Sequence, residues 1–173
     1  MNHSAWIAQL YEAESAGIFR FVCGMMRGDR SLAEDLTSRT FQKAVEHADA
    51  LARADSPRAW LIAVARNEVR MSWRHQGVVA AARRLLDRDR HAAPGGADGE
   101  WLDLIALLGR MSASDREIIL LIGLVELTAE EAGAAVGVTA EAAQKRWRRA
   151  RGRLLALAER GEGPSYRAPV PHA

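Results

Sequence analysis

Two stretches of the chain combine several cationic side chains with a tryptophan, at spacings that a helix would gather on one face. Six cations surround Trp147 within residues 145–153, and Arg66, Arg70 and Arg74 follow one another in steps of four. Lysine and arginine bind the phosphates of nucleic acids, and aromatic rings stack on unpaired bases. The chemistry that these residues predict is reversible binding of a polyanion.

Residue types and spacings do not indicate a catalytic or metal-binding set. The single cysteine, Cys23, excludes an internal disulfide and a zinc site built from cysteines, and the five histidines have no paired spacing. The carboxylates of Glu34-Asp35 and of Glu130-Glu131 are adjacent in sequence, so they diverge on a helix and are better explained by capping and solvation. We therefore expect no enzyme activity, no cofactor and no metal, and a buried Cys23 thiol.

Charge is segregated along the 173 residues, although the net charge is only +2. Residues 66–90 contain seven bases and three acids, and residues 142–160 contain seven bases and one acid. Between them, residues 98–141 contain nine acids and two bases. Two separated basic blocks indicate two places that meet a polyanion, whereas the acidic block fits either a solvated face or a surface that contacts another protein.

Helix-start signals place these blocks on helices. Three stretches have the capping-box pattern of Ser or Thr followed three residues later by Glu, at Ser31–Glu34, Ser114–Glu117 and Thr128–Glu131. Ser56 before Pro57 predicts a fourth start, because proline suits the first helical position. The expected helices cover about 4–26, 31–48, 57–75 and 101–110, one from 114, and 128–136 and 139–160. No strand pattern of any length is present.

The predicted fold is all-α, with two small helical domains joined by a flexible linker and a helix-turn-helix in the second domain. The first domain covers residues 1–76 and the second covers 101–160. Residues 77–100 form the linker, in which proline and repeated glycine disfavour regular structure, although a short helical extension at 80–90 stays open. Residues 161–173, which contain three prolines, are expected to be a loosely ordered tail.

The pattern of small residues in 128–160 predicts the helix-turn-helix. Gly133 would let the two helices approach, and Gly137 can take the positive φ of a tight turn. On a helical wheel Trp147 falls on a narrow face with Ala143, Ala150 and Leu154, so we expect it in the core rather than on a base. A solvated basic helix in a bundle is the alternative.

In a helix-turn-helix the second helix lies in the major groove with its first turns against the base edges. The residues in that position are Thr139, Glu141, Gln144 and Lys145. The cations expected to contact mostly phosphate are Arg146, Arg148, Arg149 and Arg151.

The helix expected over 57–75 has a second basic face, formed by Arg66, Asn67, Arg70 and Arg74. Trp60 and Met71 lie near its margin, and Leu61, Ile62, Ala65, Val69 and Trp73 lie broadly opposite. Cations beside a partly exposed aromatic ring suit single-stranded nucleic acid. An ordinary amphipathic helix with a solvated basic side is the alternative.

Several of these stretches carry a family resemblance. AEDL at 33–36, Phe41, PRAWL at 57–61 and ARN at 65–67, followed by Trp73-Arg74, resemble region 2 of an extracytoplasmic-function sigma factor. SASDREIILL at 112–121, ELTAEEAGAAVGVT and RWRRARGRL resemble region 4. The resemblance covers about 140 of 173 residues, and the two sets in this order are more specific than either alone.

The resemblance implies a bacterial transcription initiation factor that binds core RNA polymerase and directs promoter recognition and strand opening. It implies minus-ten contacts by Trp60, Arg66, Asn67, Arg70, Trp73 and Arg74, with the loop at about 47–56 capturing a flipped base. It implies reading of the minus-thirty-five duplex by the eight helix-turn-helix residues named above. It implies docking on the polymerase clamp helices by Glu34, Asp35, Arg39, Phe41 and Gln42, and contact of the acidic and apolar helices before the helix-turn-helix with the flap.

The remaining expectations concern partners and location. Many members of this family are held by an anti-sigma factor, so one is a possible partner, and we expect the free chain to be a monomer. The N-terminus lacks a signal-peptide pattern and no apolar run approaches ~20 residues, which predicts a cytoplasmic protein without membrane insertion. The competing interpretation is a dimeric helix-turn-helix regulator that acts on duplex sites without being a polymerase subunit.

Overall fold

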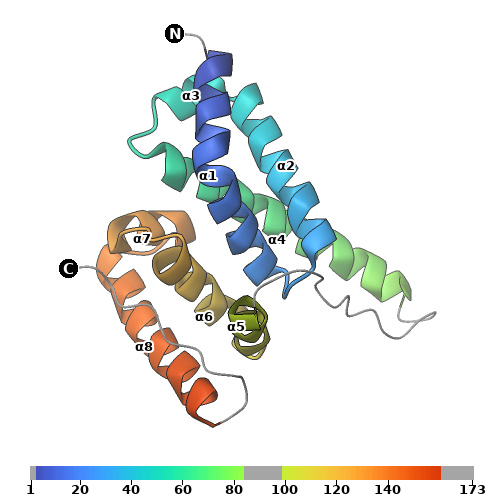
Figure 1. The fold of residues 1–173 in the computed structure, drawn as a ribbon, viewed down its shortest axis with the longest axis vertical. Helices are drawn as coiled ribbons and strands as arrows, with labels where there is room; N and C mark the ends of the chain where they lie inside the picture. Colours follow the sequence, from blue (N-terminus) through green and yellow to red (C-terminus); the bar gives the residue numbers. More distant parts are fainter. Residues whose placement is uncertain (1–2, 84–98, 161–173) are drawn as a thin grey trace.

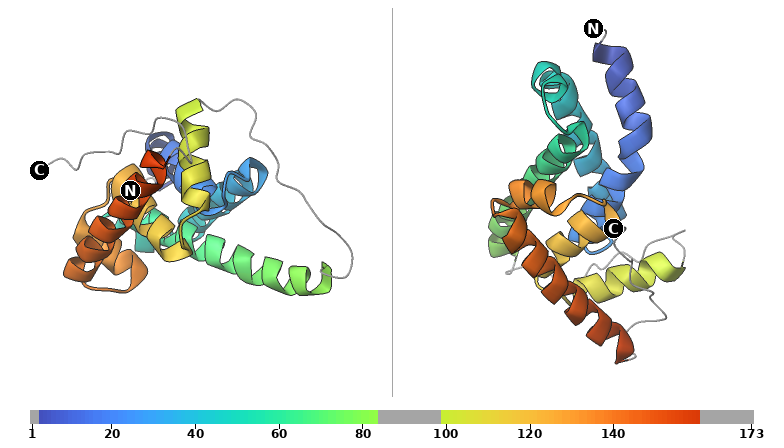
Figure 2. Two further views of the ribbon diagram at one scale, coloured as in Figure 1. Left: turned by 90° about the horizontal axis from the view of Figure 1, so that it is seen from below. Right: turned by 90° about the vertical axis from the view of Figure 1, so that its left-hand side faces the viewer.

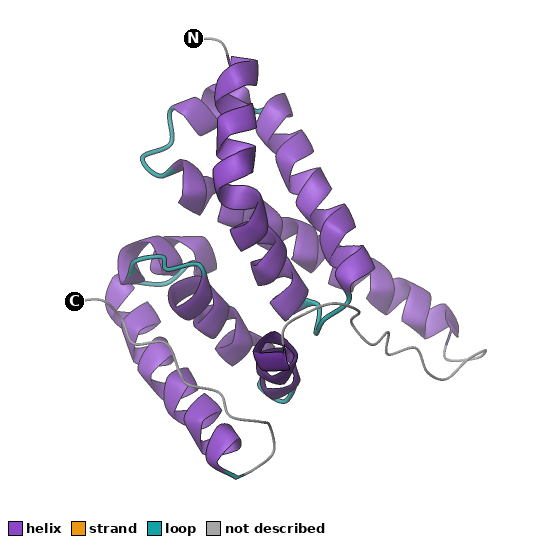
Figure 3. Cartoon of the chain, viewed as in Figure 1, coloured by secondary structure: helices purple, strands orange, loops and turns teal. Residues whose placement is uncertain are grey.

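The structure is a computed structural model that describes residues 3–83 and 99–160. Every regular element within these ranges is a helix (Figure 3), which confirms the predicted all-α class. The elements are α1 (His3–Met25), α2 (Arg30–Glu46), α3 (Ala48–Ala52), α4 (Pro57–Arg83), α5 (Gly99–Gly109), α6 (Ala113–Ile118), the π-helix η1 (Ile119–Leu124), α7 (Ala129–Val136) and α8 (Ala140–Glu159). Most of the predicted linker and the predicted tail lie outside the described residues.

Helices α1, α2 and α4 pack against one another and form the first group of elements (Figure 1). α4 begins at Pro57, where the Ser56 hydroxyl accepts the Ala59 N–H at 3.2 Å, as the sequence predicted. Its buried positions recur at helical spacing and face α1 and α2. The apolar ones are Leu61, Ile62, Ala65 and Val69, and Glu68 is also buried, at 7% exposure. Because these side chains hold one face of α4 inward, the opposite face with Arg70 and Arg74 is turned outward.

Helices α5 to α8 form the second group, with α8 packed against α5, α6, η1 and α7. Thr128 and Glu131 make the predicted capping box at the start of α7, and the Thr139 hydroxyl accepts the Ala142 N–H at the start of α8. Gly137 has a φ of 76°, in the left-handed region that a tight turn between helices uses. These three features confirm the helix-turn-helix predicted for 128–160.

The two groups share one continuous core, because α1 packs against α5, α6 and η1, and α4 packs against α7. A Cβ at Gly24 in α1 would lie 2.7 Å from Leu120 Cδ2, so the Leu120 side chain packs directly on the α1 backbone at that point. Figure 2 shows α6 and α7 beside α1 and the first part of α4, while the last turns of α4 extend away. Helix α4 continues to Arg83, beyond the predicted end near His75.

Two predicted helix starts were wrong by two residues. Asp29, not Ser31, caps α2, because its side chain accepts the Leu32 N–H at 3.0 Å. Ser112, not Ser114, caps α6 and accepts the Asp115 N–H at 3.2 Å. An earlier residue with a suitable oxygen takes the cap in each case, which leaves the predicted serine inside the first turn. A short helix, α3, also occupies part of the segment expected to be a loop at 47–56.

Candidate nucleic-acid interfaces

The predicted basic face of α4 borders an open groove between the two groups of helices. The groove has a volume of about 650 Å³ and is lined by Arg66, Arg70, Trp73, Arg74, Glu117 and Val136. Arg70 and Arg74 are exposed, whereas Arg66 is half-buried. Asn67 is exposed beside them and donates from Nδ2 to the Met71 sulfur at 3.7 Å. The predicted face therefore exists, but its first arginine is partly covered.

The two tryptophans predicted to contact the minus-ten DNA are half-buried and pack against the core. Trp73 lines the groove, and it also borders a smaller hollow of about 250 Å³ near Met25 and Ala113. Met71 is 50% exposed, so the most exposed apolar side chain at this margin is the methionine. Each tryptophan side chain therefore keeps part of its surface accessible.

The second basic face runs along the outside of α8. Trp147 is only 4% exposed and is buried with Ala143, Ala150 and Leu154, as the helical wheel predicted. Thr139, Glu141, Lys145, Arg146, Arg148 and Arg149 are exposed, and Gln144 and Arg151 are half-buried. Because the buried tryptophan fixes the rotation of α8, it determines the direction in which the cations project.

The start of α8 is held close to α7 by Gly133. A Cβ at this position would lie 2.8 Å from the Val138 carbonyl oxygen, in the turn between the two helices. The sequence predicted this role from residue size alone. Close approach here, together with the Thr139 cap, holds the first turn of α8 against the turn that follows α7.

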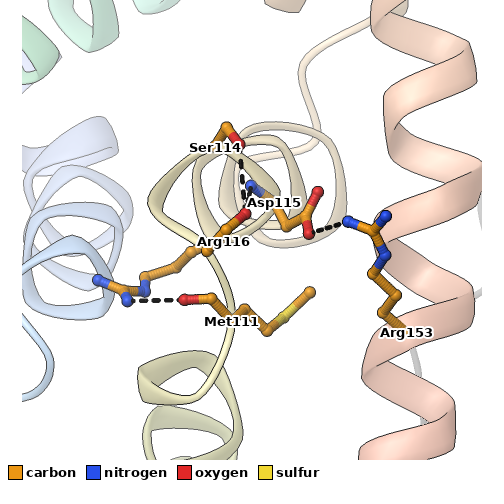
Figure 4. Close-up of polar contacts among 6 residues, drawn as sticks. Met111, Ser114, Asp115, Arg116 and Arg153 are labelled. Atoms are coloured by element: carbon orange, nitrogen blue, oxygen red, sulfur yellow. Dashed lines mark hydrogen bonds and ion pairs between the residues drawn. The ribbon is translucent and has the colours of Figure 1, made fainter.

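Two adjacent residues of α6 attach this helix to its neighbours on opposite sides (Figure 4). Asp115 accepts a hydrogen bond from Arg153 of α8. Arg116 points the other way and is 2% exposed. Its guanidinium donates to the carbonyls of Leu108 at 2.8 Å, Met25 at 3.1 Å and Met111 at 3.2 Å. Sequence reasoning missed both residues, because the contacts that join α6 to other helices, Asp115 with Arg153 and Arg116 with Met25, span 38 and 91 positions of the chain.

Burial lowers the pKa of the Arg116 guanidinium, and the charge of nearby Arg27 lowers it further. Three carbonyl acceptors compensate for the lost hydration of this charge. One of these carbonyls, from Met25, belongs to α1, so Arg116 contributes a polar tie between the two groups of helices.

The third predicted surface lies on α2. Glu34, Asp35, Arg39 and Gln42 are exposed, and Arg39 pairs with Asp35 at 2.7 Å. Phe41 differs from them, because it is 7% exposed and lies 4.7 Å from Tyr11, ring centroid to ring centroid. Tyr11 is 51% exposed and was not singled out in the sequence. The aromatic side chain accessible at this surface is therefore Tyr11, supported from beneath by Phe41.

The structure gives Glu117 a different partner from the one that the sequence predicted. It was predicted to reach back to a capping Ser114, yet its Oε1 accepts a hydrogen bond from Arg66 Nε at 2.6 Å. Because Ser112 takes the cap, the Glu117 side chain is free to face α4. No sequence pattern signals this contact, since the two residues are 51 positions apart.

Other kinds of site find no support in the described residues. Within 3–83 and 99–160 no group of His, Cys, Asp and Glu could hold a metal ion. No described helix has the length and hydropathy that crossing a membrane would require. Cys23 is buried, as expected, and burial raises the pKa of its thiol.

Comparison with known proteins places this geometry in context. Residues 10–79 match the family model of sigma-70 region 2. The chain is 32% identical over 154 residues to a probable RNA polymerase sigma-C factor of Mycobacterium bovis and to the ECF RNA polymerase sigma factor SigC of Mycobacterium tuberculosis. Each match covers 86% of this chain and 80% of the relative.

Two solved structures have the same fold. The sigma factor RpoE, crystallised with the anti-sigma factor NepR from Bartonella quintana, superposes with a TM-score of 0.74 at 27% identity, covering 88% of this chain and 96% of that one. CnrH in complex with the cytosolic domain of CnrY has a TM-score of 0.63 at 22% identity, covering 89% and 88%. The latter similarity concerns the fold alone.

Proposed function

The chain belongs to the extracytoplasmic-function family of RNA polymerase sigma factors, and we propose that its two basic faces bind different elements of the promoter, one strand-separated and the other duplex. As a sigma factor it binds core RNA polymerase and directs promoter recognition and transcription initiation. Sigma factors are not themselves enzymes, because the polymerase performs the chemistry. The observation that carries the proposal is the presence of cationic faces on both α4 and α8 in a chain that matches its relatives over most of their length.

The face of α8 is proposed to read the minus-thirty-five element as duplex. Thr139, Glu141, Gln144 and Lys145 are in its first two turns, where a major-groove helix meets base edges. Arg146, Arg148, Arg149 and Arg151 follow and would contact mainly phosphates, which supply affinity and register. Support comes from the exposure of most of these side chains on the side of α8 opposite Trp147.

The face of α4 is proposed to hold the minus-ten element after strand separation. Arg66, Arg70 and Arg74, with Asn67, would follow the backbone, and Trp60 and Trp73 would offer stacking surfaces. The segment 47–56, which includes α3, would receive a flipped base. A hollow of about 380 Å³ lined by residues of α3 and its neighbours, including His47 and Arg53, supports this placement.

Docking on the polymerase is proposed to use α2 and the hollow between α5–α6 and α8. Glu34, Asp35, Arg39 and Gln42, with Tyr11 above Phe41, would contact the clamp helices. The hollow has a volume of about 590 Å³ and combines Met111 and Leu157 with several arginines, so it would accept an apolar segment bearing acids, as expected for the flap.

Two further features are part of the proposal. RpoE is seen with an anti-sigma factor, and a comparable protein is proposed to hold this chain until a signal releases it. The location is proposed to be cytoplasmic, where core polymerase is. The free chain is proposed to be a monomer.

Run-off transcription with core polymerase on genomic fragments tests the function. We expect discrete transcripts only when both the chain and core polymerase are present. Two measurements separate this function from that of a dimeric regulator. They are sedimentation of the free chain, and gel shifts of duplex DNA by the chain with and without core polymerase. A stable dimer that shifts duplex DNA alone and yields no transcript would refute the proposal.

A further inference from the structure

The turn between α1 and α2 contains an arginine in a backbone conformation that arginine rarely adopts. Arg27 has a φ of 57°, in the left-handed region, and Gly28 follows it with a φ of 89°. The Gly28 N–H donates to the Cys23 carbonyl at 2.9 Å, and the Arg27 N–H donates to that of Gly24 at 3.3 Å. These two bonds end α1 in the manner of a Schellman motif, whose left-handed residue is usually glycine. The side chain of Arg27 therefore strains the backbone at this position.

The charge of Arg27 is a second source of instability. Burial lowers the pKa of the Arg116 guanidinium and the charge of Arg27 lowers it further, so two cations repel each other here. In the part of the chain that the structure describes, no carboxylate pairs with Arg27. Asp29, the nearest acid along the chain, caps α2 instead. Because Arg27 is exposed, its guanidinium is available to a partner outside the chain.

Arg27 lies beside the face of α4 that we assign to strand-separated DNA. It lines the hollow of about 250 Å³ together with Trp73 of α4. Trp73 also lines the groove of about 650 Å³, which Arg70 and Arg74 border. The two hollows therefore meet at Trp73, and Arg27 adds a cation next to the α4 row from a different element of the fold.

A phosphate is the partner that these surroundings favour. Guanidinium groups bind phosphate through two parallel hydrogen bonds. A nucleic-acid strand that follows Arg70 and Arg74 has a phosphate at every nucleotide, so its next phosphates would meet a cation placed beyond Trp73. A phosphate at Arg27 would also offset the repulsion between Arg27 and Arg116. Strained or destabilising residues without a partner inside the chain are typical of binding sites.

We propose that Arg27 binds a phosphate of promoter DNA next to the minus-ten element, so that the turn between α1 and α2 extends the DNA-binding face of α4. This inference rests on the function proposed for α4 and adds a contact from another element. It predicts that Arg27 stabilises the complex with DNA and destabilises the free chain. An acidic side chain of core polymerase is the competing partner, and the tests distinguish the two.

The first test measures the stability of the full chain in urea, without DNA or polymerase. Arg27→Asn removes the charge and introduces a residue that tolerates the left-handed region, so the urea midpoint should rise by about 0.3 M. The matched control, Arg20→Gln, removes an exposed arginine of α1 that lines neither hollow, and should leave the midpoint unchanged. An equal or lower midpoint in Arg27→Asn would overturn the inference, because Arg27 would then have no cost for a ligand to offset.

The second test measures binding of the polymerase complex to a promoter fragment that run-off transcription has identified. Arg27→Asn should weaken binding about fivefold at 0.1 M salt and lower the slope of log affinity against log salt by about one. Arg27→Lys, which keeps the charge, should recover most of the affinity, and Arg20→Gln should match the parent. Because Arg27→Asn is expected to be the more stable chain, its loss of affinity would not reflect a damaged fold.

A third measurement locates the phosphate. Single methylphosphonate linkages, which lack the negative charge, replace the phosphates of the minus-ten region one at a time. In the parent, affinity should fall at a linkage where Arg27→Asn shows no loss, because that variant has already lost the contact. Identical profiles for the parent and Arg27→Asn would overturn the inference.

Two comparisons separate this inference from its alternatives. The affinity of the chain for core polymerase, measured without DNA, should be the same for the parent and Arg27→Asn. A loss of core affinity, with unchanged binding of the assembled complex to DNA, would assign Arg27 to the polymerase and refute the phosphate contact. The absence of any transcript from the parent would refute the proposed function instead, whereas the urea comparison needs neither DNA nor polymerase.

Discussion

At the scale of single residues, the outer face of α8 contains side chains suited to two different tasks. Gln144 is half-buried near the start of the helix, where an amide can recognise a base edge, and Arg149 is exposed one and a half turns later. We expect Arg149→Ala to weaken binding to all promoters by a similar factor and to reduce the slope of log affinity against log salt by about one. Gln144→Ala should instead change the ranking of minus-thirty-five sequences.

Competition binding of the polymerase complex to a library of minus-thirty-five variants, at several salt concentrations, measures both effects. Parallel losses of affinity in the two variants, with unchanged ranking, would show that the division between reading and anchoring is wrong.

Trp147 is the residue on which the direction of the α8 cations depends. Its side chain is buried in the helix-turn-helix core. Trp147→Ala should lower the free energy of unfolding by about 3–5 kcal/mol, the usual cost of removing a large buried aromatic side chain. Arg148→Ala, at the adjacent exposed position, should change it by less than about 0.5 kcal/mol. Urea denaturation followed by circular dichroism measures both, and equal stabilities would place Trp147 outside the core.

The sequence predicts residues buried within one helical pattern better than residues that pair with a side chain of another helix. Trp147 could be assigned to the core because three buried residues share its helical face, which is a local and periodic signal. Glu117 could not be paired with Arg66, because their contact depends on how α6 packs on α4. Tyr11 was missed for the same reason, since its partner Phe41 comes from another helix.

At the scale of elements, the caps show what a short pattern can specify. The Thr128–Glu131 pattern predicted a real capping box, but the same pattern at Ser31 and Ser114 did not. A hydroxyl or carboxylate two residues earlier satisfies the pattern of an N-cap equally well, and only the path of the preceding turn decides between them. Helix existence was therefore predictable, whereas helix starts were not in two of these cases.

The cap of α6 provides a direct test of this correction. Ser112→Ala should destabilise the chain by about 1 kcal/mol, because the Asp115 N–H loses its acceptor. Ser114→Ala, inside the first turn, should cost less than about 0.5 kcal/mol. Thermal denaturation of both variants measures the two losses of stability. A larger loss of stability in Ser114→Ala than in Ser112→Ala would show that Ser114 is the N-cap, as the sequence predicted.

At the scale of the whole molecule, Glu131 makes the stability of the folded chain sensitive to acid. Its pKa is held below the ordinary value of 4.5, so its ionised form stabilises the folded state. That stabilisation is fully present above about pH 4.5 and is lost as the pH falls through the lower pKa of the folded chain. The stability difference between the parent and Glu131→Gln should therefore be constant from pH 6 to 8 and shrink below 4.5. Urea midpoints across this range measure it, and a difference independent of pH would mean that this carboxylate has no such role.

The packing of one group of helices on the other depends on Arg116 more than on any surface ion pair. A pair such as Arg39–Asp35 is exposed and contributes about 0–1 kcal/mol, whereas Arg116 is buried and satisfies three carbonyls. Arg116→Met keeps much of the side-chain volume but removes the guanidinium donor from all three carbonyls, of which that of Leu108 still accepts the Met111 N–H at 3.1 Å. The expected cost is about 1–3 kcal/mol for a buried group that loses its partner. Because the Met25 carbonyl is in α1, whereas that of Leu108 is in α5 and that of Met111 follows α5, the loss should loosen the contact between the groups as well as the second group itself.

Calorimetry of the full chain measures this effect. We expect one cooperative transition in the parent, and in Arg116→Met a lower first transition that separates from the second, because helices that no longer share a core unfold independently. Arg148→Ala, which removes an exposed arginine, serves as the control and should keep the single transition. A single unshifted transition in Arg116→Met would mean that apolar contacts such as Leu120 on Gly24 are sufficient to hold the groups together.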